Sequence, residues 1–250
     1  METGTRQKAG HDEVLMKKVA IVQSNYIPWK GYFDLIASVD EFILYDDVQY
    51  TKRDWRNRNI IKTQQGPYWL SIPVKVKGKY FQKIEETELL DEKWAEQHWK
   101  TLYHTYKAAP FFDEIASLLK PLYLESSFTH LSVLNRRFLQ EICNYLKITT
   151  PITPSSTYGS TDLPPNEKLI DLCVKANANI YISGPAAKAY MNEALFQTHG
   201  LTVQWFDYSG YPEYPQLWGA FDHKVSIVDL LFNCGPDSRS YMKTKPVNSE

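Results

Sequence analysis

Hydrophobic and polar positions follow a regular order at the start of the chain. Residues 19–23 form an almost wholly apolar run, which is typical of a strand buried on both faces of a parallel sheet. Residues 24–28 predict a turn, and Pro28 suits the first position of a helix because no intrahelical hydrogen bond is lost there. Apolar side chains at helical spacing then predict a helix over 29–37, and a second strand follows over 41–45.

The next pattern predicts a β-hairpin. Residues 55–62 form one candidate strand, 64–67 the turn, and 68–74 the returning strand. Arginine and asparagine alternate over residues 56–59. In a strand this alternation would place both guanidinium groups on one face and both amides on the other.

The rest of the chain alternates helical and strand patterns. About residues 91–147 are helical, and we interpret them as an inserted cap over the carboxyl edge of the sheet. Strands are then predicted over 150–157, 180–183 and 202–206, with helices between them. This order predicts an α/β protein with a Rossmann-like, mostly parallel sheet, a β-hairpin extension and an inserted helical cap.

We interpret residues 18–240 as a single domain, because 43% apolar residues suffice for a sizeable core. Residues 1–17 are expected to form a disordered tail, and residues 241–250 a second tail. The last helix is predicted to begin at Ser226, with Asp229 three residues later in an arrangement that resembles a capping box.

Composition excludes several classes of function. A formal net charge of −1 gives no long-range field that would attract nucleic acid, and no polybasic run suggests a membrane surface. No run reaches the ~20 apolar residues of a membrane helix. Three cysteines without metal-like spacing predict reduced thiols. We therefore expect a cytoplasmic protein without membrane insertion, nucleic-acid partner or metal site.

Candidate binding residues gather where the predicted strands end and along the hairpin. Asp46 and Asp47 follow the second strand, at the edge where open α/β sheets bind ligands. Two forked guanidinium groups beside amides favour an anionic, hydroxyl-rich ligand such as a nucleotide-linked sugar. The candidate substrate-binding residues are Gln23, Tyr26, Gly31, Asp47, Gln49, Trp55, Arg56, Asn57, Arg58, Asn59, Ser183, Gly184, Tyr214 and Gln216.

His98 and Asp46 are the candidate catalytic bases. His98 can act as a general base near neutral pH if the helical cap brings it close to Asp46. If residues of the cap itself surround the imidazole, Asp46 remains as the only candidate base. A metal between Asp46 and Asp47 lacks a clear third ligand. Cys234 ends a helix, where the dipole does not favour a thiolate, so we expect no thiol nucleophile.

Six segments resemble the WbqC-like family of bacterial proteins, in the family's order, and the resemblance covers roughly residues 18–240. The segments are 23–33, 46–50, 55–59, 182–185, 214–218 and 226–233. The resemblance implies a role in making surface polysaccharides, especially the O-antigen of lipopolysaccharide. The order of strand, turn, Gly-containing helix, strand and basic segment is weakly similar to that of nucleotidylyl transferases, but Trp29 and Tyr32 replace both histidines of their His-x-Gly-His motif.

Three functional hypotheses follow. The first is a transferase that acylates the amino group of a nucleotide-linked amino sugar, with a thioester donor on an acyl carrier protein or coenzyme A. The second is a non-catalytic nucleotide-sugar-binding or assembly factor for a polysaccharide pathway. The third is a divergent nucleotidylyl transferase. The sequence does not identify the sugar, the donor or the oligomeric state.

Overall fold

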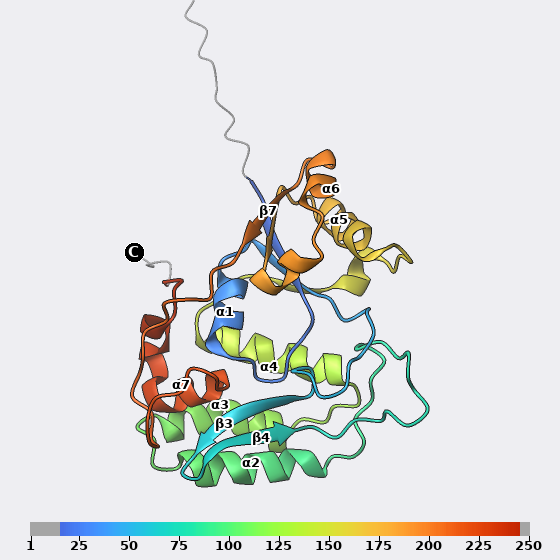
Figure 1. Cartoon of the computed structure of the whole chain (residues 1–250). Coiled ribbons are helices and arrows are strands. Elements are labelled where there is room, and N and C mark those ends of the chain that lie inside the picture. Colours follow the sequence, from blue (N-terminus) through green and yellow to red (C-terminus); the bar gives the residue numbers. More distant parts are fainter. Residues whose placement is uncertain (1–15, 246–250) are drawn as a thin grey trace, which may run out of the picture.

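The computed structural model describes residues 16–245, so most of the first predicted tail (1–15) and the end of the second (246–250) lie outside it. At its centre is a parallel sheet with the strand order β5-β2-β1-β6-β7 (Figure 1). A separate antiparallel hairpin joins β3 to β4. The strands are β1 (Lys18–Val22), β2 (Glu41–Leu44), β3 (Arg58–Thr63), β4 (Gly66–Ser71), β5 (Ile152–Pro154), β6 (Ile180–Ser183) and β7 (Thr202–Trp205). The predicted α/β fold with a Rossmann-like sheet is confirmed.

The helices are α1 (Lys30–Ala37), α2 (Lys93–Tyr106), α3 (Phe112–Leu124), α4 (Leu131–Tyr145), α5 (Pro165–Lys175), α6 (Glu193–Thr198) and α7 (Ile227–Cys234). Short 3₁₀ segments occupy Ser155–Tyr158, Pro185–Ala189 and Gly235–Tyr241. Within residues 16–245, no helix is long and apolar enough to cross a membrane.

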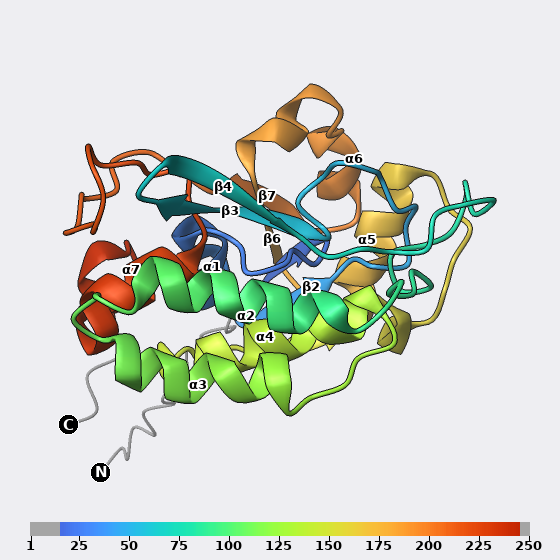
Figure 2. The same cartoon turned by 90° about the horizontal axis from the view of Figure 1, so that it is seen from below.

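The two faces of the sheet are covered differently. Alternate residues of β1 point to opposite faces, so Val19 and Ile21 join Cys173 and other residues of α5 and α6, whereas Ala20 joins the larger core. That larger core includes residues of α1, α4, α2, α3 and α7. Figures 1 and 2 show α5 and α6 on one side and the inserted helices on the other. The inserted helices are therefore a packed layer that shares the main core.

The hairpin begins later than the sequence pattern predicts. Residues 52–57 form turns, with Arg53 in the left-handed region at φ 60°, and β3 starts at Arg58. Arg56 thus precedes the strand. The expectation that Arg56 and Arg58 share one strand face is wrong, because the alternation of side chains starts only where the extended backbone starts.

The described parts of both predicted tails contact the domain. Lys17 places its Nζ atom 2.8 Å from a carboxylate oxygen of Glu41. Near the other end, the backbone N–H groups of Lys243 and Thr244 donate to the buried carboxylate of Asp34. Residues 241–245 are therefore part of the fold.

Candidate functional site

A cavity of about 350 Å³ lies beside the turn that joins β1 to α1. In the observed strand order, the connections from β1 and β6 run to opposite sides of the sheet, and such a switch point is where open α/β sheets bind ligands. The turn, the hairpin and residues 223–225 enclose the cavity. It is lined by Asn25, Pro28, Trp29, Trp55, Asn59, Ile60, His223, Lys224 and Val225.

The turn has an unusual backbone. Ile27 has φ 35°, in the left-handed region that β-branched residues rarely adopt. The start of α7 holds it there, because Ser226 Oγ donates to the carbonyl of Ile27 (2.6 Å) and Ile227 N–H to that of Pro28 (2.9 Å). Ser226 also caps α7, as predicted, by accepting from Val228 N–H. Backbone strain of this kind is concentrated at functional sites.

Gly31 shapes the cavity through its neighbour Trp29. A Cβ atom at position 31 would lie 2.3 Å from the Trp29 indole, so only glycine lets this ring fold back over the helix. The indole also packs against Tyr208 and Tyr211, each with a ring separation of 5.4 Å. The group closest to Gly31 is therefore the Trp29 indole, which forms part of the cavity wall.

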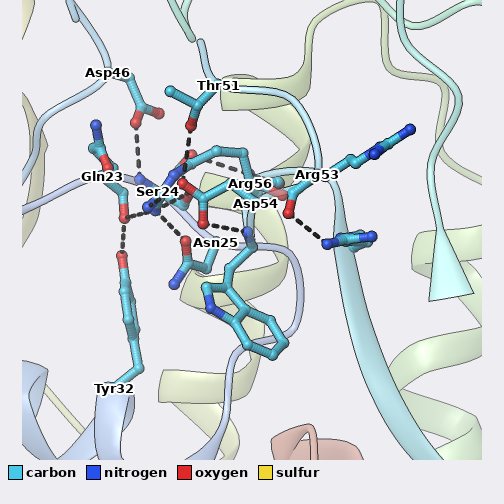
Figure 3. Close-up of polar contacts among 12 residues, drawn as sticks. Gln23, Ser24, Asn25, Tyr32, Asp46, Thr51, Arg53, Asp54 and Arg56 are labelled. Carbon is cyan, nitrogen blue, oxygen red and sulfur yellow. Dashed lines mark hydrogen bonds and ion pairs between the residues drawn. The ribbon is translucent and has the colours of Figure 1, made fainter. Parts of the chain in front are cut away.

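Arg56 fixes the same turn from the side of the hairpin (Figure 3). Its buried guanidinium lies 3.4 Å from the carbonyl oxygens of Gln23 and Ser24 and donates to the side-chain oxygen of Asn25. It also pairs with Asp54 at 3.4 Å. Arg56 thus holds the turn and one cavity residue, and its guanidinium does not line the cavity.

Asp46 belongs to the same network. One carboxylate oxygen accepts from Ser24 N–H (2.8 Å), and the other accepts from Ser132 Oγ in α4. Burial raises the pKa of Asp46, and the hydrogen bond from Ser132 opposes that rise. The structure places Asp46 outside the cavity lining, as a tie between the turn and α4.

Asp47 points toward α5. Its carboxylate lies 2.6 Å from Nζ of Lys168 and accepts from Ser155 Oγ (2.6 Å). Both members of the ion pair are largely buried. Among residues 16–245, no group of three or more His, Cys, Asp or Glu side chains converges as a metal site would require.

His98 lies in the core and not in the cavity. Its Nδ1 is 2.9 Å from the hydroxyl of Tyr26, and its Nε2 is 3.2 Å from the carbonyl oxygen of Ser71. The Tyr26 hydroxyl also lies 2.6 Å from that of Tyr123. Burial lowers the pKa of His98 to about 4. With both ring nitrogens occupied, the geometry gives His98 and Tyr26 packing roles, and His98 is not poised as a base.

Tyr214 and Gln216 converge on Asp229. Both side chains donate to its carboxylate, at 2.8 and 2.9 Å, and Tyr106 donates to the second oxygen at 2.8 Å. Buried Lys62 of β3 donates to Gln216 Oε1 at 2.7 Å. The expected capping role of Asp229 is wrong, because its carboxylate serves these donors. The network anchors the long segment between β7 and α7 that contributes residues 223–225 to the cavity.

Asn57 and Gln49 bind backbone elsewhere. Asn57 Nδ2 donates to the carbonyl of Ile72 (2.8 Å), and Gln49 Nε2 to that of Tyr80 (2.8 Å). Neither lines the cavity.

Ser183 ends β6 and Gly184 follows it, as predicted, but neither residue lines the cavity. Ser183 is buried, and a Cβ at Gly184 would meet the Tyr208 ring at 3.4 Å. Arg58 lies on the outer face of the hairpin, with its guanidinium carbon 4.2 Å from the centre of the Trp69 ring. Of the predicted residues, the structure therefore brings only Trp55 and Asn59 together in the cavity.

His223 lines the cavity, although the sequence favoured His98 over the other histidines as the base. Its ring packs against Phe221 with a centroid separation of 4.5 Å, and no hydrogen bond within residues 16–245 occupies its nitrogens. Partial burial, followed by the nearby charge of Lys30, lowers the pKa of His223. Residues 223–225 are distant in sequence from the hairpin, so no motif spacing indicated that they meet in the cavity. Asn25 and Trp29 do fall inside the motif that pointed to this turn.

Comparisons with known proteins agree with the motif resemblance. Residues 23–241 match the WbqC-like protein family. The chain is 56% identical over 228 residues to the Mycobacterium tuberculosis protein Rv1507c, itself uncharacterized, covering 91% of this chain and 98% of the relative. No solved structure matches. The chain belongs to the WbqC-like protein family.

Proposed function

We propose that the cavity binds a nucleotide-linked amino sugar and that the protein is a transferase that acylates its amino group. The proposal rests on two indoles (Trp29 and Trp55), the Asn25 amide and the unpaired imidazole of His223, which line one cavity at the switch point, whereas the buried Asn59 side chain binds the Tyr26 carbonyl and the Ile60 N–H. A few polar groups set in an aromatic, apolar wall are typical of small-molecule sites. The product would enter synthesis of a bacterial surface polysaccharide, in keeping with the family resemblance.

In the proposed step, His223 takes a proton from the sugar's amino group as the nitrogen attacks the carbonyl carbon of an acyl thioester. An amide C–N bond forms, the C–S bond breaks, and the departing thiolate takes up a proton. The lowered pKa of His223 keeps its imidazole neutral and able to accept a proton at neutral pH. The acyl donor is a thioester of a carrier protein or coenzyme A.

Direct transfer to the amine is favoured over an acyl-enzyme on cysteine. Cys143, Cys173 and Cys234 are buried, and burial raises the pKa of each thiol to about 12. A reactive cysteine needs a lowered pKa, because the thiolate is the nucleophile.

The test combines purified protein, nucleotide-linked amino sugars and acyl thioesters, and mass spectrometry detects the acyl increment on the sugar. In His223→Gln, kcat should fall by about 10² to 10⁴ because the general base is lost. The Kd for the nucleotide sugar should stay within about threefold, since Gln keeps hydrogen-bonding capacity. His199→Gln, at the end of α6, is the matched control. A kcat within tenfold of wild type in His223→Gln would remove His223 as the base.

The second candidate is a non-catalytic nucleotide-sugar-binding or assembly factor. It is favoured by the commitment of Asp46, Asp47 and His98 to contacts within the protein, which leaves no carboxylate in the cavity lining. This candidate predicts tight binding of the nucleotide sugar and no mass increment with any thioester. Stabilisation by ATP with magnesium, and not by nucleotide sugars, would instead favour a nucleotidylyl transferase.

A further inference from the structure

An exposed aromatic stack joins the hairpin to the turn that precedes it, beside the cavity. The rings of Trp55 and Trp69 have centroids 5.3 Å apart and planes inclined by 30°. These residues are 43% and 41% exposed, although large apolar rings are usually covered. The guanidinium carbon of Arg58 lies 4.2 Å from the centre of the Trp69 ring. We call Trp55, Trp69 and Arg58 the hairpin platform.

The hairpin platform is continuous with the cavity. Trp55 belongs to both, and the cavity residue Ile60 is the direct cross-strand partner of Trp69. Directly paired residues point to the same face of a hairpin, so Ile60 and Trp69 share the outer face while Leu70 points into the core. A ligand that leaves the cavity past Trp55 therefore meets the stack next.

The charges at this rim suit a phosphate. Arg58 donates through one terminal nitrogen to the carbonyl of Arg53, and its Nη1 has no hydrogen-bond partner within the described residues. Lys224 adds an exposed cation to the cavity lining. An arginine stacked on an indole can still bind a phosphate oxygen through its free N–H groups.

The cavity alone is too small for the whole proposed ligand. Its 350 Å³ lies at the lower end of ligand pockets, which span about 300–1,000 Å³. A molecule with a base, a ribose, two phosphates and a sugar must therefore extend beyond it. The Asn25 amide and the His223 imidazole inside suit the sugar, which leaves the nucleoside diphosphate at the rim.

We propose that the hairpin platform binds the nucleoside diphosphate part of the ligand, with the base stacked on the indoles and Arg58 Nη1 on a phosphate oxygen. This inference rests on the proposed function for the identity of the ligand. It places the sugar in the cavity and the nucleoside diphosphate on the outer face of the hairpin.

The test uses nucleoside diphosphates without sugar or thioester. UDP, dTDP, ADP and GDP are titrated separately, with calorimetry and tryptophan fluorescence as readouts. At least one should bind wild type, and Trp69→Ala should weaken its Kd at least fivefold, because stacking of a base on an aromatic ring contributes about 1–3 kcal/mol. Arg58→Gln should weaken the same diphosphate at least fivefold but change the Kd of the unphosphorylated nucleoside less than twofold.

Two controls separate stacking from folding. Trp69→Phe keeps an aromatic face and should bind within about threefold of wild type. Tyr103→Ala removes a similarly exposed ring (44%) from α2 and should leave affinity unchanged. Each variant is used only if it melts cooperatively near the wild-type temperature.

The hairpin platform would be overturned if none of the four diphosphates binds, or if Trp69→Ala changes the Kd less than fivefold. Binding of a neutral oligosaccharide in place of the diphosphates would also overturn it. Failure of acyl transfer alone would leave this inference intact, because its probes need no transfer. Conversely, Trp69→Ala could transfer the acyl group with an unchanged KM for the nucleotide sugar. That result would show that the hairpin platform does not bind the ligand, and it would leave the proposed function intact.

Discussion

Two polar regions at the carboxyl edge of the sheet differ in what their side chains contact. Around Asp46, Asp47 and Arg56, charged groups are buried and bound to other parts of the protein. In the cavity, His223 and Lys224 are exposed, and His223 has no hydrogen-bond partner for its ring within residues 16–245. The charge-rich motif therefore builds the scaffold, and the less conspicuous residues line the cavity.

The difference has a physical cause. A buried charge is tolerated when it is paired and hydrogen-bonded, so a dense motif of aspartates and arginines can enter the interior only by binding to itself. A ligand site needs groups that stay unpaired until the ligand arrives. Such groups must remain partly in water, which favours residues on an irregular segment over residues in the packed turn.

Breaking the buried ion pair of the scaffold region should reduce stability more than any other change. Asp47→Ala removes the partner of buried Lys168 and should lower the free energy of unfolding by about 3–5 kcal/mol, because an uncompensated charge remains inside. Urea denaturation measures this loss. Glu141→Ala, which breaks an exposed pair with Arg137, is the control and should cost less than about 1 kcal/mol. A loss below about 1 kcal/mol in Asp47→Ala would mean that this pair does not hold the scaffold.

A somewhat smaller effect concerns pH. Burial lowers the pKa of His98 to about 4, from an unfolded value of about 6.5, so between these pH values only the unfolded chain binds this proton. The contribution of neutral His98 to the free energy of unfolding is fully present above pH 6.5. This contribution falls by about 3 kcal/mol as the pH decreases toward 4.

Urea denaturation at pH 7, 5.5 and 4.5 measures that cost as the difference between wild type and His98→Gln. The difference is needed because the raised pKa values of Asp46 and Asp229 contribute in the opposite direction. His199→Gln should keep the wild-type dependence on pH. Parallel curves for wild type and His98→Gln would show that His98 is not buried in its neutral form.

Much of the fold was predictable because its signals are local. The apolar run at 19–23, the turn before α1 and the serine at the start of α7 each carry their own cue, and β1, α1 and α7 follow. The hairpin start was missed because the turn over residues 52–57 reads as a continuation of the alternating pattern. Alternation predicts a shared face only where the backbone is extended.

The site was predictable only in part. Trp55 and Asn59 were found because they stand in a segment rich in recognition chemistry. His98 was chosen for its chemistry, but nothing in its sequence neighbourhood reveals that Tyr26 and the Ser71 carbonyl occupy both nitrogens. His223 reaches the cavity through the anchoring of its segment by Lys62 and Asp229, which is a tertiary arrangement without a local sequence signal.

Filling the cavity with a large side chain shows whether the nucleotide sugar binds there. Ile60→Trp places an indole on β3 at the cavity wall, whereas Val133→Trp adds the same group at an exposed position of α4. Calorimetry with UDP-linked and dTDP-linked amino sugars should show binding to wild type and Val133→Trp. In Ile60→Trp with a cooperative melt, the Kd should weaken by about a hundredfold, or 2.7 kcal/mol. Equal affinity of Ile60→Trp and wild type would contradict the assignment of this cavity as the ligand site.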